Sequence, residues 1–102
     1  MATRLSPEAA HDLDALWDFI AADSGNTDSA DREIGSILRR MLVLAHHTYI
    51  GRARDADLGP GRRSLMAGRY AIIYRVAGPD ALILRIVHGQ RDLQAMFGLS
   101  DI

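Results

Sequence analysis

The chain has 102 residues, of which 48% are hydrophobic and 25% charged, so we expect one folded domain over residues 1–102 and exclude a disordered or collagen-like protein. No apolar run approaches the roughly 18 residues of a membrane span, and the first residues lack the apolar core of a secretion signal. Cysteine is absent, which excludes disulfide frameworks and thiolate metal sites and fits a cytoplasmic protein.

The net charge of −1 conceals an uneven distribution along the chain. Residues 1–33 carry eight acidic residues and two arginines, whereas residues 34–102 carry ten arginines and five aspartates. All twelve basic residues are arginine, the side chain best suited to bidentate contacts with carboxylates or phosphates. The sequence therefore predicts a basic face formed by the C-terminal half.

Two helices are expected in the N-terminal half. Ser6 is a suitable N-cap and Pro7 suits the first helical position, so a helix should run from Pro7 to near Ala22. Apolar residues then recur at helical spacing, and Ser24-Gly25-Asn26 predicts a turn. A second helix should start between Thr27 and Ala30, which gives an antiparallel helical hairpin.

The periodicity changes to two in the C-terminal half. Residues 46–61 look irregular, but sixteen residues is long for a structureless connection, so a short strand or a functional role is expected there. Strands are predicted at 62–66, 69–76 and 81–88, with a four-residue turn at 77–80, and Thr3–Leu5 is a candidate short strand. The expected fold is α+β, with the helical hairpin packed on a small, mostly antiparallel β-sheet.

A regular hairpin around residues 77–80 would pair Val76 with Ala81 and Arg69 with His88, and a bulge would change this register. One predicted face holds Tyr70, Ile72, Tyr74, Ala81, Ile83, Arg85 and Val87. The other holds Arg69, Ala71, Ile73, Arg75, Leu82, Leu84, Ile86 and His88. Both faces are largely apolar. The helices should cover one, and either the segment Leu93–Leu99 or a partner should cover the other.

Several motifs occur in a characteristic order. A Leu-Ser-Pro-Glu-Ala helix start at Leu5–Ala9 is followed by Gly51-Arg52-x-Arg54 and by Leu58-Gly59-Pro60-Gly61-Arg62. The last two are Tyr70-x-Ile72-Ile73-Tyr74-Arg75 and Arg85-Ile86-Val87-His88-Gly89-Gln90-Arg91-Asp92-Leu93. From Leu5 to Phe97 the chain thereby resembles the ParE toxins of bacterial type II toxin–antitoxin modules, within the RelE/ParE superfamily.

The resemblance implies a cytoplasmic toxin that binds and inhibits DNA gyrase, which blocks replication, and that a ParD-like antitoxin neutralises. It implies no catalytic residue, no cofactor, no membrane contact and no sequence-specific DNA binding by the toxin alone, and it allows a higher-order toxin–antitoxin oligomer. The residues expected to bind the antitoxin are Arg52, Arg54, Arg69, Arg75 and Arg85. The residues expected to contact the target are His88, Arg91 and Asp92.

RelE-like relatives instead cleave messenger RNA on the ribosome, and this is the alternative function. Cleavage needs a general acid or base and cations around the phosphate. His88 is the candidate acid or base, and Arg69, Arg75 and Arg85 are the candidate cations. The absence of lysine argues against this alternative, as does the position of Glu8 and Glu33, the only glutamates, on predicted helices.

His46 and His47 are adjacent, and His11 is a third histidine, so a metal site is one possible interpretation. Adjacent residues on a helix point about 100° apart, which disfavours shared coordination of one ion. No metal is therefore expected.

Overall fold

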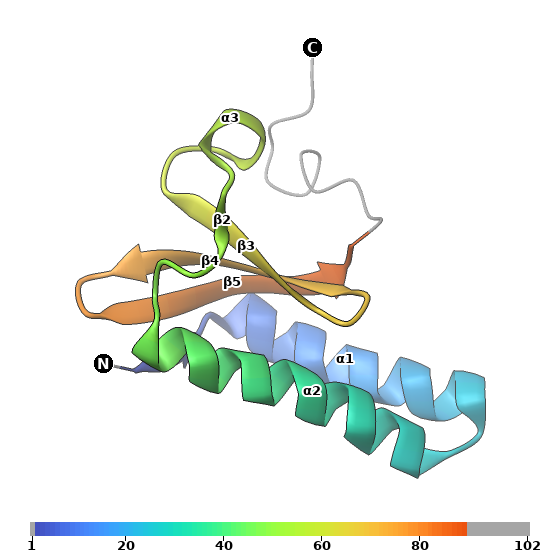
Figure 1. Ribbon diagram of the computed structural model, residues 1–102. Helices are drawn as coiled ribbons and strands as arrows, with labels where there is room; N and C mark the ends of the chain where they lie inside the picture. The colour runs from blue at the N-terminus through green and yellow to red at the C-terminus, as the bar shows by residue number, and fades with distance from the viewer. Residues whose placement is uncertain (1, 90–102) are drawn as a thin grey trace.

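The computed structural model describes residues 2–89, which form two layers. Helices α1 (Pro7–Ser24) and α2 (Thr27–His46) make an antiparallel hairpin that covers one face of a five-stranded sheet (Figure 1). The strands are β1 (Thr3–Leu5), β2 (Arg52–Ala53), β3 (Arg62–Ala67), β4 (Tyr70–Ala77) and β5 (Asp80–His88). The predicted α+β fold is thereby confirmed. No helix in residues 2–89 combines the length and apolar composition that crossing a membrane requires.

The helix boundaries follow the capping residues. The backbone N–H of Ala9 donates to Ser6 Oγ at 3.0 Å, and Pro7 begins α1, as predicted. The helix ends at Ser24 and is capped by Gly25, whose φ of 66° lies in the left-handed region that glycine adopts without strain. Asn26 is the N-cap of α2, and its side chain accepts from the backbone N–H of Asp28 in the first turn. Two adjoining caps therefore define the tip of the hairpin.

The strand order in the sheet is β1-β5-β4-β3-β2. Only β1 and β5 are parallel, and every other pair is antiparallel. The predicted short strand Thr3–Leu5 is confirmed as β1. The irregular stretch before β3 holds β2 and a short helix, α3 (Asp55–Leu58). The long connection thus supplies an edge strand, as expected from its length.

The predicted register of β4 and β5 is correct only near their turn. Val76 pairs with Ala81 as expected, and the turn is the shorter Gly78-Pro79. A bulge between Ile73 and Tyr74 shifts the remaining pairs by one residue, so Tyr70 and not Arg69 lies opposite His88. Arg69 itself lies in the β3–β4 turn.

The bulge also corrects the predicted faces of β5. Ile86 packs in the core beneath the helices, whereas Val87 belongs to the opposite face. A β-bulge inserts one extra residue into one strand, so every side chain beyond it changes sides. The predicted placement of Ile86 and Val87 was therefore wrong.

The main core lies between the helical hairpin and the sheet. Its largest fully buried side chains include Ile37, Leu44, Ile72, Tyr74 and Ile83. A smaller cluster lies on the other face of the sheet and joins α3 to β4 and β5 through Leu58, Ala71, Ile73 and Val87. Both faces are apolar, as predicted. The segment Leu93–Leu99, a candidate cover for the second face, lies outside the described residues.

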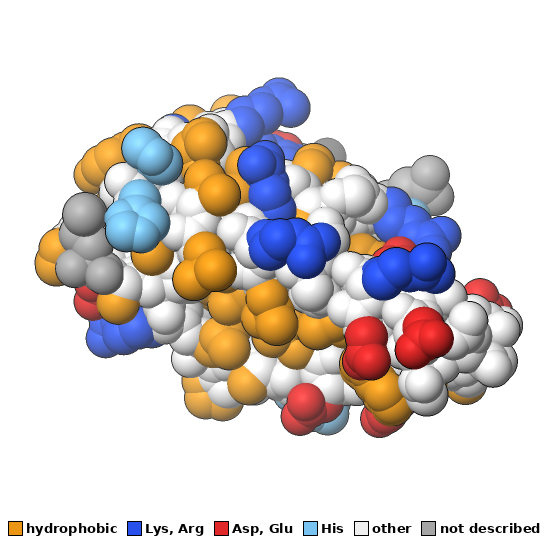
Figure 2. Space-filling model, turned by 60° about the horizontal axis from the view of Figure 1, so that its bottom comes forward, with side chains coloured by type: hydrophobic (Ala, Val, Ile, Leu, Met, Phe, Trp, Pro, Cys, Tyr) orange, Lys and Arg blue, Asp and Glu red, His pale blue; other side chains and the backbone are white. Residues whose placement is uncertain are grey.

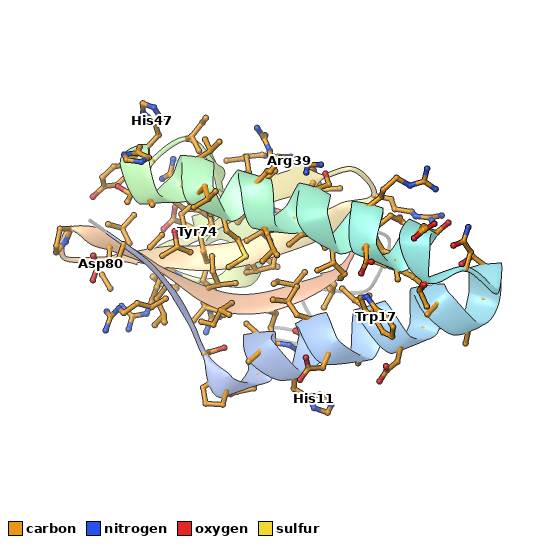
Figure 3. The ribbon with its side chains drawn as sticks, turned by 90° about the horizontal axis from the view of Figure 1, so that it is seen from below. His11, Trp17, Arg39, His47, Tyr74 and Asp80 are labelled. Carbon is orange, nitrogen blue, oxygen red and sulfur yellow. The ribbon has the colours of Figure 1, made fainter. Side chains whose placement is uncertain are left out.

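A tyrosine from the core holds the connection between α2 and β2. Tyr74 lies between the two helices when the molecule is viewed from the helical side (Figure 3). Its hydroxyl donates to the carbonyl of Thr48 and accepts from the backbone N–H of Gly51, both at 2.8 Å. The Arg63 guanidinium donates to the carbonyls of Tyr49 and Gly51 and stacks over the Tyr49 ring. These contacts place β2 beside the start of β3.

Candidate functional site

A hollow of about 400 Å³ lies near the tip of the helical hairpin. It is lined by the end of α1, the start of α2, the β3–β4 turn and the end of β5. Its polar and aromatic lining includes Phe19, Asp23, Glu33, Arg69, Tyr70 and His88. A carboxylate, a guanidinium, a phenol and an imidazole therefore share one hollow.

An ion pair links the two layers at this hollow. Nη2 of Arg69 lies 3.1 Å from Oε1 of Glu33, and its Nε donates to the same oxygen at 3.2 Å. The hydrogen bonds from Arg69 to Glu33 raise the pKa of the guanidinium. Sequence reasoning excluded Glu33 because it lies on a helix. The fold nevertheless brings it to a residue 36 positions later, which no local spacing signals.

The aromatic part of the hollow comes from the shifted strand register. Tyr70 faces His88 across β4 and β5, with ring centroids 5.9 Å apart and planes at 82°, an edge-to-face arrangement. Burial raises the pKa of Tyr70, and the nearby Glu33 carboxylate raises it further. Tyr70 therefore stays protonated at neutral pH, where its hydroxyl can donate a hydrogen bond.

Arg85 belongs to a different part of the molecule. Its guanidinium binds Asp12 of α1 through two hydrogen bonds, Nε to Oδ2 at 2.7 Å and Nη2 to Oδ1 at 3.0 Å. Asp12 also accepts from the backbone N–H of Ile86 at 2.9 Å, and its side chain is only 11% exposed. The hydrogen bonds that Arg85 donates to Asp12 raise the pKa of the guanidinium. This arginine is fixed within the fold.

The other predicted arginines lie along the far part of the sheet. Arg54 binds Asp57 of α3, with Nε 2.9 Å from each carboxylate oxygen, and this contact lowers the pKa of Asp57. Arg52 is exposed on β2 and Arg75 is exposed on β4. Arg75 lies five residues from Tyr70 along β4, which corresponds to about 16 Å of extended strand.

The structure therefore divides the predicted site residues into separate groups. Arg69 and His88 share the hollow, whereas Arg85 lies against α1. Arg91 and Asp92, the other predicted target contacts, lie outside the described residues. In residues 2–89 no three His, Asp or Glu side chains are grouped closely enough to hold a metal ion. His47 and His11 lie at opposite edges of the helical layer, beside α2 and α1 respectively (Figure 3).

The helical face of the molecule has its own charge pattern. Figure 2 shows a band of apolar side chains across it, with most basic side chains above the band and most acidic ones below. Leu38 and Leu42 on α2 contribute exposed apolar surface, with Leu42 67% exposed. The sequence-level separation of charge thus becomes a separation on the surface.

Comparison with known proteins identifies related chains. Residues 3–93 match the family model described as "ParE toxin of type II toxin-antitoxin system, parDE". Toxin ParE1 of Mycobacterium tuberculosis is 32% identical over 90 residues, which cover 87% of this chain and 90% of the relative. Toxin ParE3 and Toxin RelE3 of Caulobacter vibrioides are 33% and 38% identical over 87 residues, covering 85% and 82% of this chain and 85% and 89% of the respective relatives.

A solved structure is similar over most of the chain as well. It is described as the chromosomal ParDE toxin–antitoxin system from P. aeruginosa, and it matches with a TM-score of 0.74 and 28% identity. The match covers 86% of this chain and 95% of that chain. The arrangement of two helices on a five-stranded sheet is therefore shared with a solved relative.

Proposed function

The chain belongs to the ParE toxin family of type II toxin–antitoxin systems, within the RelE/ParE superfamily, and on this premise we propose that it inhibits DNA gyrase by binding. In this proposal the chain performs no chemistry of its own, and the bound gyrase stalls replication. Membership in the ParDE family implies a cognate ParD-type antitoxin, which would keep the toxin inactive until it is removed.

The separation of the cationic side chains carries this proposal. Cleavage of RNA needs a general acid or base and cations around one phosphate. Of the four residues predicted for that chemistry, only Arg69 and His88 line the hollow. Arg85 is held by Asp12 at 2.7 Å, and Arg75 is about 16 Å along β4 from Tyr70. A binding role requires no such convergence.

The exposed surface supports a partner protein. Leu42, Tyr49 and Met66 are 67%, 69% and 48% exposed. The Arg63 guanidinium lies over the Tyr49 ring, and Arg40 donates to the carbonyl of Met66. Apolar surface of this kind is stabilised when a partner covers it. An antitoxin with acidic and apolar side chains would complement it.

A gyrase cleavage assay tests the proposal directly. Purified chain is incubated with gyrase, supercoiled plasmid and ATP, and detergent and protease are added before electrophoresis. We expect linear DNA that depends on the chain and disappears when the antitoxin is in excess. Normal supercoiling without linear DNA, with the chain shown to be folded, would overturn the proposal.

The hollow favours one second candidate, a ribosome-dependent endoribonuclease. Glu33, Arg69, Tyr70 and His88 together supply a carboxylate, a cation, a phenol and an imidazole. The test is cleavage of ribosome-bound messenger RNA by the His88→Ala and Glu33→Gln variants, with His47→Ala as the control outside the hollow. Cleavage that both hollow variants lose and the control keeps would establish the nuclease. No cleavage by the unmodified chain would exclude it.

A further inference from the structure

Phe19 is an exposed aromatic side chain that lies between two hollows. It is 63% exposed and belongs to neither apolar cluster of residues 2–89. It lines the hollow of about 400 Å³ at the hairpin tip, and it also lines a second hollow of about 240 Å³ beside Leu16 and Ile86. His88, a predicted target contact, lines both hollows as well. The fold therefore presents this ring on the surface instead of burying it.

The end of the helical hairpin also projects from the molecule. At the right of Figure 1, α1 and α2 extend past the strands to their connection. Phe19 lies about 1.4 helical turns before Ser24, the last residue of α1. A projecting aromatic ring with a hollow on each side suits a protein interface, because a few aromatic residues that insert into a partner carry most of the binding free energy of such interfaces.

The charges beside Phe19 are negative. Asp18 precedes it in α1, and Asp23 follows one helical turn later and lines the larger hollow. Within residues 2–89, no arginine or histidine lies at ion-pair distance from either aspartate. Arg69, which lines the same hollow, is held by Glu33 at 3.1 Å. The ring is therefore flanked by two carboxylates whose charge the described residues do not neutralise.

This charge selects among the molecules that could cover Phe19. Two copies of the chain that met at their hairpin tips would bring Asp18 and Asp23 close to their counterparts, and like charges oppose such a contact. The phosphates of DNA and the carboxylates of an acidic antitoxin are repelled for the same reason. An enzyme that binds DNA, in contrast, presents Lys and Arg side chains to the phosphates, and a surface of that kind complements the two aspartates.

We propose that Phe19 and its two hollows dock on a basic surface of DNA gyrase, with the ring inserted between gyrase side chains and with Asp18 and Asp23 paired to gyrase Lys or Arg. This inference rests on the proposed inhibition of gyrase, and it specifies which surface of the toxin makes the contact. It leaves Leu42, about 22 Å along α2 from Thr27 at the tip, to the antitoxin.

Phe19→Ala tests the ring, with Leu42→Ala as the matched control. Both variants shorten an apolar side chain of the helical hairpin, and the two side chains are 63% and 67% exposed, so both variants should stay folded. The affinity of each variant for immobilised gyrase and for the ParD-type antitoxin is measured. We expect Phe19→Ala to weaken gyrase binding more than about tenfold and to keep its antitoxin affinity within about twofold. Leu42→Ala should weaken antitoxin binding alone.

The gyrase cleavage assay with the same variants separates this inference from the proposed function. We expect linear DNA from the unmodified chain and from Leu42→Ala, but not from Phe19→Ala at the same concentration. As much linear DNA from folded Phe19→Ala as from Leu42→Ala would overturn the docking surface and leave the inhibition of gyrase standing. No linear DNA from the unmodified chain would overturn the inhibition of gyrase and this inference with it.

Asp23→Asn tests the charge, with Asp14→Asn as the control farther back on α1. Both aspartates are exposed, and both variants lose the same charge. We expect Asp23→Asn to weaken gyrase binding about threefold at low salt and to make it less dependent on salt, because a contact with gyrase Lys or Arg is lost. Asp14→Asn should change both far less. Equal effects of the two variants would mean that the overall charge of the chain acts on gyrase, which would overturn the pairing beside Phe19.

Discussion

The two edges of the sheet differ in how their unpaired backbone N–H and C=O groups are satisfied. Beyond β1, the β5 edge is closed by α1, since Ser6 Oγ donates to the carbonyl of Leu84 at 2.9 Å and Asp12 accepts from the N–H of Ile86. Beyond β2, the contact that residues 2–89 make with the β3 edge is the exposed one from Arg40 to the carbonyl of Met66. An edge strand with open backbone groups invites pairing. The fold therefore closes one edge with side chains of the α1 region, whereas at the other edge an arginine of α2 contacts the strand from an exposed position.

The largest expected effect comes from removing the Asp12 carboxylate, which closes the β5 edge. Asp12→Ala leaves the Ile86 N–H without its acceptor and Arg85 without its carboxylate, which should cost about 2–4 kcal/mol of unfolding free energy. Urea unfolding measures the loss. Asp14→Ala, on the exposed side of α1, should stay within about 0.5 kcal/mol of the unmodified chain. Equal stability of the two variants would show that Asp12 does not close this edge.

The second test acts on the strand that covers the start of the β3 edge. A Cβ at Gly51 would lie 2.5 Å from the Tyr74 hydroxyl and 2.8 Å from the carbonyl oxygen of Ser64. Gly51→Ala should therefore displace β2 and cost about 1–3 kcal/mol. Thermal unfolding of this variant beside Gly35→Ala is the measurement, because a Cβ at Gly35 meets only the far end of Arg39. A loss no greater than that of Gly35→Ala would mean that β2 is loosely held.

Tyr74→Phe should have a smaller effect at the same place. It removes the hydroxyl that donates to Thr48 and accepts from Gly51, which leaves a buried N–H without a partner, at a cost of about 1–2 kcal/mol. Denaturant unfolding gives the loss, and faster exchange of the Gly51 amide locates it. Unchanged exchange at Gly51 would show that Arg63 alone holds the connection.

The smallest expected effect concerns the ion pair between Arg54, which follows β2, and Asp57 of α3. The hydrogen bonds from Arg54 lower the pKa of Asp57 below its ordinary value of 3.8. A carboxyl group with a lowered pKa in the folded state contributes stability above its unfolded pKa and loses it as the pH falls through the folded value. Asp57→Asn should therefore be slightly less stable at pH 7, and the difference should vanish in acid. A difference that does not depend on pH would assign the effect to packing.

Local chemistry was sufficient to predict the helical layer and the position of the β4–β5 turn, although the turn is shorter than predicted. Ser6 and Pro7 begin α1 because capping depends on neighbouring residues, and Val76 faces Ala81 because they adjoin the turn. The bulge beyond them could not be predicted from local spacing, and just past it the N–H of Ile86 donates to Asp12, 74 residues earlier. One misplaced residue then changed the predicted faces of everything up to His88.

The candidate site shows the same limit. Arg69 and His88 were predicted to be cross-strand neighbours, and they do line one hollow, but Tyr70 is the residue opposite His88. The sequence analysis excluded Glu33 from the candidate catalytic residues. Its place on a helix does not show that the β3–β4 turn with Arg69 lies beside it. The spacing of residues in the sequence predicts the strands. It does not predict which side chains from distant segments come together on them.

The parallel pairing of β1 with β5 has a consequence for how the chain acquires its structure. The backbone N–H of Ala2 donates to the Asp80 side chain, 78 residues later, and Thr3–Leu5 pair with residues 81–83. During synthesis the helical hairpin emerges first, but β1 must wait until β5 has left the ribosome. Contacts this distant in sequence slow folding. The sheet therefore closes only after residues 80–88 have left the ribosome.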